Sequence, residues 1–267
     1  MTRILRDEDV EKIEQNLILL KSRYTKLVFK IFNIQNVFKN EKSKEYLIHG
    51  VVRRLDVIER CVENIYSIFP LRREKLLSRD ELKDVDINLH AFFINIFGLL
   101  DNIAWVVVYE KNKSVTIDKR TVGLYKKETQ ECLDDDFKKY LNSDIMKKWH
   151  DEYLRNYRNA LSHRIPLYVH PKKLTQKQKE QEEVIGEKIV EAMKNQDTDE
   201  MDTLQREMDG IGEPSPSFVH SLSETGNKFV ILHAQVITDF GTVEEIIKKF
   251  CESFEVVNPT KNFSTSI

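Results

Sequence analysis

Apolar residues recur at steps of three and four over most of the first two thirds of the chain, the period of an amphipathic helix. This pattern predicts long helices over residues 8–35, 43–69 and 84–111, and a fourth that Ser143 caps and Pro166 ends. The range 87–109 is apolar nearly all round, so we expect it to lie in the centre of the fold. Residues 112–132 are poorly periodic and are predicted to be a connection with one short helix.

The chain after Pro166 has a different pattern. Residues 165–169 are expected to be extended, and the strongly polar range 172–213 carries two weak helical stripes that predict an exposed helical hairpin. Glycines and prolines between residues 210 and 216 mark the end of this hairpin. It is either a solvated insertion or an arm that binds a partner.

The last fifty residues are predicted to hold a β-hairpin and a helix. The two strands are expected at Phe218–Ser223 and Phe229–Ile237, with His220 opposite His233. Thr242 and Glu245 have the spacing of a capping box that would open the last helix. The predicted fold is therefore mainly α: a helical bundle over residues 1–171, a charged helical insertion over 172–214, and a β-hairpin with a final helix that packs on the bundle over 215–267.

Composition agrees with a folded, helix-rich protein. Of 267 residues, 40% are hydrophobic and 32% are charged, and only 8 glycines and 6 prolines are present, which favours long helices over turns. Three well-separated cysteines argue against a disulfide framework, and the N-terminus has no apolar signal core, so we expect a cytoplasmic protein. The apolar range 87–109 also contains Asn88, His90, Asn95, Asp101 and Asn102, which are expensive in lipid, so no membrane span is expected.

The candidate chemistry lies late in the fourth predicted helix. Arg158 and His163 have four residues between them. Arginine carries a permanent charge on a fork that matches phosphate oxygens, and histidine can move protons near neutral pH. Together they suit metal-independent cleavage of RNA, in which the histidine exchanges a proton with the 2′-hydroxyl or the leaving oxygen and the arginine stabilises the phosphate.

The spacing of this pair raises a geometric question. Residues five apart in a regular helix are about 140° apart around the axis and about 7.5 Å apart along it. The pair therefore needs a long arginine reach, a loosened last turn before Pro166, or a second copy of the motif. Asn159 shares the face of His163 and is expected to orient the imidazole.

Positive charge gathers around the motif. Between Lys147 and Lys179 there are nine basic residues against two acidic ones, an excess of seven in a chain of net charge −2. This favours RNA binding, although a helix C-terminus also favours cations. The expected RNA-binding residues are Arg155, Arg164, Lys172 and Lys173, and Asp101 and Asn102 are either a buried polar pair or a support for the site.

The segment Arg158-Asn159-Ala160-Leu161-Ser162-His163 resembles the Arg-x4–6-His motif of the HEPN superfamily, including the polar residue that this family prefers after the arginine. Residues 100–105, Leu-Asp-Asn-Ile-Ala-Trp, are similar to the central helix of stand-alone bacterial HEPN proteins. The resemblance covers roughly residues 43–170.

This resemblance implies a HEPN-like bundle and a metal-independent endoribonuclease without cofactor. It also implies a homodimer in which two motifs face each other, and a toxin, abortive-infection or other defence role with an antitoxin or defence-system partner protein. Two alternatives remain open. One is a non-catalytic HEPN-like module that binds a nucleotide or a protein, and the other is a structural core histidine beside a surface arginine.

Overall fold

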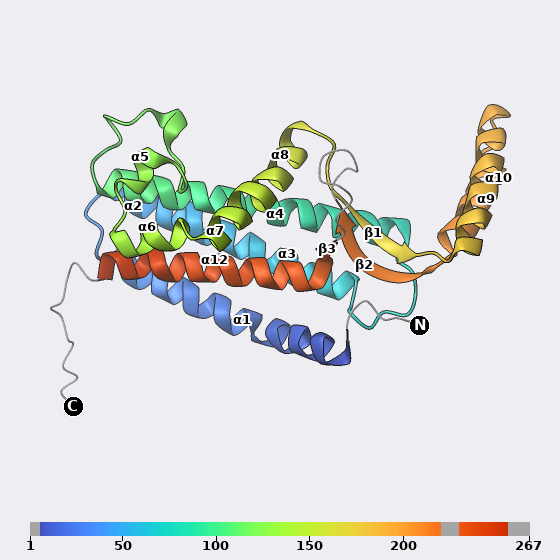
Figure 1. Cartoon of the computed structure of the whole chain (residues 1–267), viewed down its shortest axis with the longest axis horizontal. Helices are drawn as coiled ribbons and strands as arrows, with labels where there is room; N and C mark the ends of the chain where they lie inside the picture. The colour runs from blue at the N-terminus through green and yellow to red at the C-terminus, as the bar shows by residue number, and fades with distance from the viewer. Residues whose placement is uncertain (1–5, 220–229, 256–267) are drawn as a thin grey trace.

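The computed structural model describes residues 6–219 and 230–255, without the side chain of residue 171. It is mainly α, with a small antiparallel sheet in the C-terminal region (Figure 1). The long helices are α1 (Asp7–Gln35), α3 (Arg53–Ile68), α4 (Arg79–Glu110) and α12 (Leu232–Glu255). Helix α3 continues directly from α2 (Glu41–Glu45) and the π-helical segment η1 (Tyr46–Val52), which confirms the predicted helix over 43–69.

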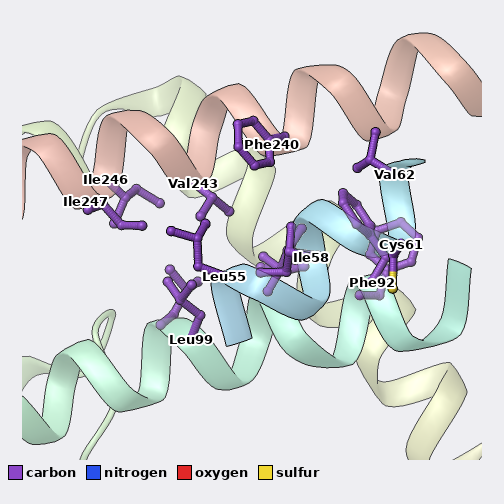
Figure 2. Close-up of a cluster of buried hydrophobic side chains, with 14 of the residues drawn as sticks. Leu55, Ile58, Cys61, Val62, Phe92, Leu99, Phe240, Val243, Ile246 and Ile247 are labelled. Carbon is purple, nitrogen blue, oxygen red and sulfur yellow. The ribbon is translucent and has the colours of Figure 1, made fainter. Parts of the chain in front are cut away.

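Three of these helices form the centre of the core. Helix α3 lies between α4 and α12, and its apolar side meets side chains from both neighbours (Figure 2). Leu55 and Ile58 of α3, Phe92 and Leu99 of α4, and Phe240 of α12 are fully buried. Truncating one such side chain to alanine typically costs about 2–5 kcal/mol of stability. This buried layer therefore holds α4 in a fixed position relative to α3 and α12.

Helix α4 begins five residues before the predicted start. Ser78 Oγ accepts a hydrogen bond from the Glu81 amide at 3.2 Å, and Glu81 Oε2 accepts one from the Ser78 amide at 2.7 Å, a complete capping box. Its most apolar 18-residue window is long and hydrophobic enough to cross a membrane, and 56% of that window is buried in the fold. Buried core helices of soluble proteins share this composition, and α4 packs against α3.

Short elements connect α4 to the motif-bearing helix: η2 (Lys119–Thr121), α5 (Lys127–Gln130) and α6 (Asp135–Leu141). Asp134 caps α6 by accepting bonds from the amides of Asp136 and Phe137, so the first of three consecutive acids has a structural role. Ser143 then caps a continuous helical run made of α7 (Asp144–Lys147), the π-helical η3 (Lys148–Leu154) and α8 (Arg155–His163). This confirms the predicted fourth helix.

The charged insertion is a helical hairpin mounted on two strands. Strand β1 (Tyr168–Lys173) leads into α9 (Gln176–Lys194) and α10 (Thr198–Asp209), and β2 (Glu213–Val219) returns antiparallel to β1 with Lys173 paired to Glu213. The hairpin has a small core of its own and projects away from the bundle (Figure 1). The predicted boundary between residues 171 and 172 lies inside β1.

The predicted strand over Phe229–Ile237 is wrong for most of its length. Among the described residues of this range, Val230–Ile231 form a strand, β3, which pairs with β2, and α12 begins at Leu232. The β-branched run continues the helical spacing of the later apolar face, and burial of that face against the bundle outweighs local strand propensity. Thr242 is therefore not a cap; it lies inside α12, where its hydroxyl donates to the Thr238 carbonyl at 3.1 Å. His220, which was predicted to lie opposite His233, is outside the described residues.

Candidate functional site

Arg158 lies in the seam between α8 and α4. Its guanidinium carbon is 4.9 Å from the centre of the Phe97 ring, and its Nη1 donates to Asn159 Oδ1 at 3.0 Å. The side chain is half-buried, so both contacts hold a charged fork at a fixed place on the surface of α4. The expectation that Asn159 orients His163 is not met, since in the described part of the chain Asn159 bonds to Arg158 and not to His163.

Asp101 lies on α4 one turn after Phe97 and interacts with cations from two other helices. Burial raises the pKa of Asp101 to about 6, and the charges of Arg158 and Arg54 oppose that rise. The carboxylate of Asp101 therefore interacts electrostatically with an arginine of α8 and an arginine of α3. Of the two residues predicted to support the site, Asp101 interacts electrostatically with Arg158, whereas Asn102 accepts a hydrogen bond from Arg54.

Arg54 was not predicted from the sequence. Its Nε donates to Asn102 Oδ1 at 2.9 Å and its Nη1 to Asn95 Oδ1 at 3.1 Å, so it bridges two amides of α4. A Cβ atom at Gly98 would lie 2.4 Å from the Arg54 Cζ atom, so the glycine makes room for the guanidinium against α4. On the α3 sequence alone, Arg54 is one polar position of an amphipathic helix, and only the neighbouring helix reveals its partners.

An aromatic stack fixes the other side of the seam. The rings of Tyr125 and His150 are parallel within 9° with centres 3.8 Å apart, and His150 lies 6.0 Å from Phe97. Burial lowers the pKa of His150, so the ring is neutral near pH 7. The stack runs from Tyr125 through His150 and Phe97 to Arg158, and it holds the aromatic surface on which Arg158 rests.

His163 lies at the end of α8 and is exposed. The amide of Arg164 still donates to the Ala160 carbonyl at 3.1 Å, so the last turn of α8 is regular, and of the three options a loosened last turn does not apply. Arg158 faces α4 while His163 faces solvent, and the two are not brought together within one chain. The alternative of a core histidine beside a surface arginine is wrong, because His163 is exposed and Arg158 is half-buried.

The expected RNA-binding cations differ in their surroundings. Arg155, Arg164 and Lys173 are exposed, and Arg155 lies 3.8 Å from Asp151 in a weak surface pair. Lys172 is half-buried; it forms an ion pair with Glu182 and donates to the Met208 carbonyl at 2.9 Å. Lys172 thus joins the helical hairpin to its stalk, a role that composition alone does not reveal.

The motif-bearing helix is fixed to α12 by a buried carboxylate. Asp239 is fully buried and accepts hydrogen bonds from Trp149 Nε1 at 2.8 Å, from the Tyr153 hydroxyl at 2.6 Å and from Gln235 Nε2 at 3.0 Å. Burial raises the pKa of Asp239 to about 6, and the three donors oppose that rise. Trp149 and Tyr153 both belong to η3, so this carboxylate sets the position of the helix that carries Arg158.

Arg54 and Arg158 each lie in the first turn or so of an α-helix that continues from a π-helical segment. Arg54 is the second residue after η1, and Arg158 is the fourth residue after η3. A π-helical turn shifts the helix face by an extra residue and occurs often at functional sites. Both arginines contact the same stretch of α4, Arg54 at Asn95 and Asn102 and Arg158 at Phe97.

Within the described ranges, no group of three or more histidine, cysteine, aspartate or glutamate side chains is arranged to hold a metal ion. No family model, curated protein or solved structure matches the chain. The case for function therefore rests on the residues and their geometry.

Proposed function

We propose that the chain is a metal-independent endoribonuclease of the HEPN type, cytoplasmic and dimeric, that cleaves RNA through the 2′-hydroxyl in a toxin, abortive-infection or other defence role. The observation that carries the proposal is the contrast within α8. Arg158 is held half-buried on Phe97 by Asn159, while His163 is exposed and in reach of a substrate. A fixed cation and an accessible proton carrier are the two parts that this chemistry requires.

In this mechanism His163 accepts the proton of the 2′-hydroxyl as its oxygen attacks the adjacent phosphorus. Arg158 donates to the phosphate oxygens and stabilises their added negative charge in the transition state. The bond from phosphorus to the 5′-oxygen breaks, that oxygen takes up a proton, and the products are a 2′,3′-cyclic phosphate and a 5′-hydroxyl. Since Arg158 and His163 of one chain point apart, each site combines Arg158 of one subunit with His163 of its partner.

The test is cleavage by three proteins: wild type, His163→Ala and Arg158→Ala. Both variants should lose cleavage by at least about two orders of magnitude, because each removes one of two required functions. His163→Ala should keep the wild-type melting temperature, since the ring is exposed. Wild-type cleavage rates in folded His163→Ala protein would refute the assignment.

The second candidate is a non-catalytic helical module that binds a nucleotide or a protein partner. The observation that favours it is the regular last turn of α8, which keeps Arg158 and His163 apart in one chain. A monomer in solution with no cleavage of any RNA would favour this candidate over the first.

A further inference from the structure

We propose that Arg54 and Arg158 together form an anion site over Asp101, and that this site binds a phosphate group. Naming RNA as the carrier of that phosphate rests on the proposed function, whereas the anion site itself does not. The site lies on α4, which has α3 on one side and α8 on another. Arg54 becomes a second phosphate-binding residue beside the motif arginine.

The first argument is the choice of hydrogen-bond partners. Of the five N–H donors of a guanidinium, Arg54 commits two and Arg158 commits one, and all three acceptors are neutral amide oxygens. Within the described part of the chain, neither arginine forms an ion pair with a carboxylate. Three donors on Arg54 (five minus two) and four on Arg158 (five minus one) are left for water or a ligand.

Other half-buried arginines of this chain behave differently. Arg23 pairs with Glu244 and Arg73 pairs with Glu81, with side-chain exposures of 23% and 21% for the two arginines. A half-buried arginine that serves only the fold is thus satisfied by a carboxylate here, as the expense of burying a charge requires. Arg54 and Arg158, which both contact the same stretch of α4, are half-buried without such a carboxylate partner in the described part of the chain.

The second argument is the local charge. Asp101 interacts with both guanidinium groups without a hydrogen bond to either, so the cluster carries two positive charges against one negative charge, a net charge of plus one. A phosphodiester group has one negative charge and oxygens that accept from arginine forks. Asp101 opposes such an anion, so its carboxylate weakens the site and sets its affinity.

The third argument is the space provided for Arg54. A Cβ atom at Gly98 would overlap the guanidinium of Arg54. A Cβ atom at Gly50 would lie 2.8 Å from Cγ of Asn102, the residue whose side chain orients Arg54. Two glycines on two helices therefore permit the arrangement. A Gly98→Ala substitution would move the guanidinium of Arg54 away from α4, although the protein would keep the same number of charges.

The experiment measures binding of an uncleavable 2′-O-methyl RNA oligonucleotide over a range of salt concentrations. Arg54→Gln should weaken binding about tenfold and reduce the slope of log affinity against log salt by about one, because one phosphate contact is lost. Asp101→Asn should strengthen binding, a result that a purely structural carboxylate does not predict. Arg60→Gln is the matched control, since Arg60 is an exposed arginine of the same helix that pairs with Glu63 and should leave binding unchanged.

Inorganic pyrophosphate, tested by thermal shift, separates the two sources of phosphate. Stabilisation of wild type that is lost in Arg54→Gln, together with RNA binding, supports the site and its RNA ligand. Stabilisation without RNA binding supports the anion site and overturns RNA as the ligand. Should Arg54→Gln not fold, Gly98→Ala replaces it, with the same weakening expected.

The site is overturned if Arg54→Gln and Arg60→Gln bind RNA and pyrophosphate alike. RNA cleavage by wild type in that case would leave the proposed function intact, so the two failures are distinguishable. Weaker RNA binding in Arg54→Gln but no cleavage by wild type would support the site and refute the nuclease.

Discussion

At the scale of single residues, buried and half-buried polar groups between helices set the geometry of the site. Asn159 holds Arg158, Asn95 and Asn102 hold Arg54, and Asp239 holds the helix from which Arg158 projects. A buried polar group is stabilising only when its hydrogen bonds are complete. Each of these groups therefore links the stability of the fold to the placement of a charge.

Asp239→Asn should destabilise the protein by about 1–3 kcal/mol, because an amide offers one oxygen and one N–H₂ to three donors and leaves at least one donor unpaired. Chemical denaturation of wild type and Asp239→Asn at pH 7 measures the difference. Equal unfolding free energies would show that the network contributes nothing.

The same carboxylate gives the protein a pH dependence. The pKa of Asp239 is about 6 in the folded protein against 3.8 for the free group, so the folded state binds its proton more tightly. The resulting stabilisation is full below pH 4 and is lost as the pH rises through 6. The unfolding free energy of wild type should fall between pH 4.5 and pH 7 by more than that of Asp239→Asn, and a fall of the same size in both would contradict the assignment.

The sequence predicts those residues whose role is visible along one helix. Arg158, Asn159 and His163 form a contiguous motif, and Asp101 and Asn102 interrupt an apolar run. Arg54, His150 and Tyr125 carry no such signal, because their partners lie on other elements. For Lys172 the prediction from charge is misleading. Its position in a basic segment predicts contact with RNA, whereas its ammonium group joins β1 to α9 and α10.

At the scale of elements, apolar periodicity over a long range predicts the helices correctly, whereas local strand propensity gives a wrong prediction at Phe229–Ile237. The helices over 7–35, 41–68 and 144–163 follow from repeated apolar spacing and from Ser143 and Pro166 at their ends. The run Phe229–Ile237 is rich in β-branched residues and was predicted as a strand, but its apolar positions share the face that α12 buries. The two π-helical segments have no pattern in a single sequence by which they are recognised.

The arm formed by α9 and α10 should be removable. Its core, which includes Ile185 and Leu204, is separate from that of the bundle, and its stalk ends in the paired residues Lys173 and Glu213. Replacing residues 174–212 with Asn-Gly, which favours a two-residue hairpin turn, should leave a cooperatively folded bundle. Its melting temperature should stay within a few degrees of wild type.

Measuring RNA cleavage by this shortened protein then shows whether the arm takes part in the proposed site. Activity equal to wild type means that the arm lies outside the site, whereas a folded but inactive protein means that the arm takes part in it. Loss of cooperative unfolding would contradict the independence of the two cores. Lys172→Ala in the full-length chain is the milder control, since it removes the contacts of Lys172 with Glu182 and Met208 and keeps the arm in place.

At the scale of the whole molecule, the orientation of α8 leads us to predict that the proposed mechanism needs a second subunit. Arg158 faces α4 and His163 faces solvent at the end of the same regular helix. One chain therefore presents its two chemical groups to different surroundings. A symmetric dimer with α8 at its two-fold axis would bring each arginine near the partner's histidine. Sedimentation equilibrium should show this dimer at micromolar concentration.

Mixing two inactive variants tests this arrangement directly. In a dimer of Arg158→Ala with His163→Ala, one composite site keeps both its arginine and its histidine, and the other site loses both. Random exchange of subunits makes half of the dimers mixed, each with one of two sites intact, so an equal mixture should recover about a quarter of the wild-type cleavage rate. Each variant alone should remain inactive. If the arginine and histidine of one chain act together, the mixture stays as inactive as its components, and that result would refute the shared site.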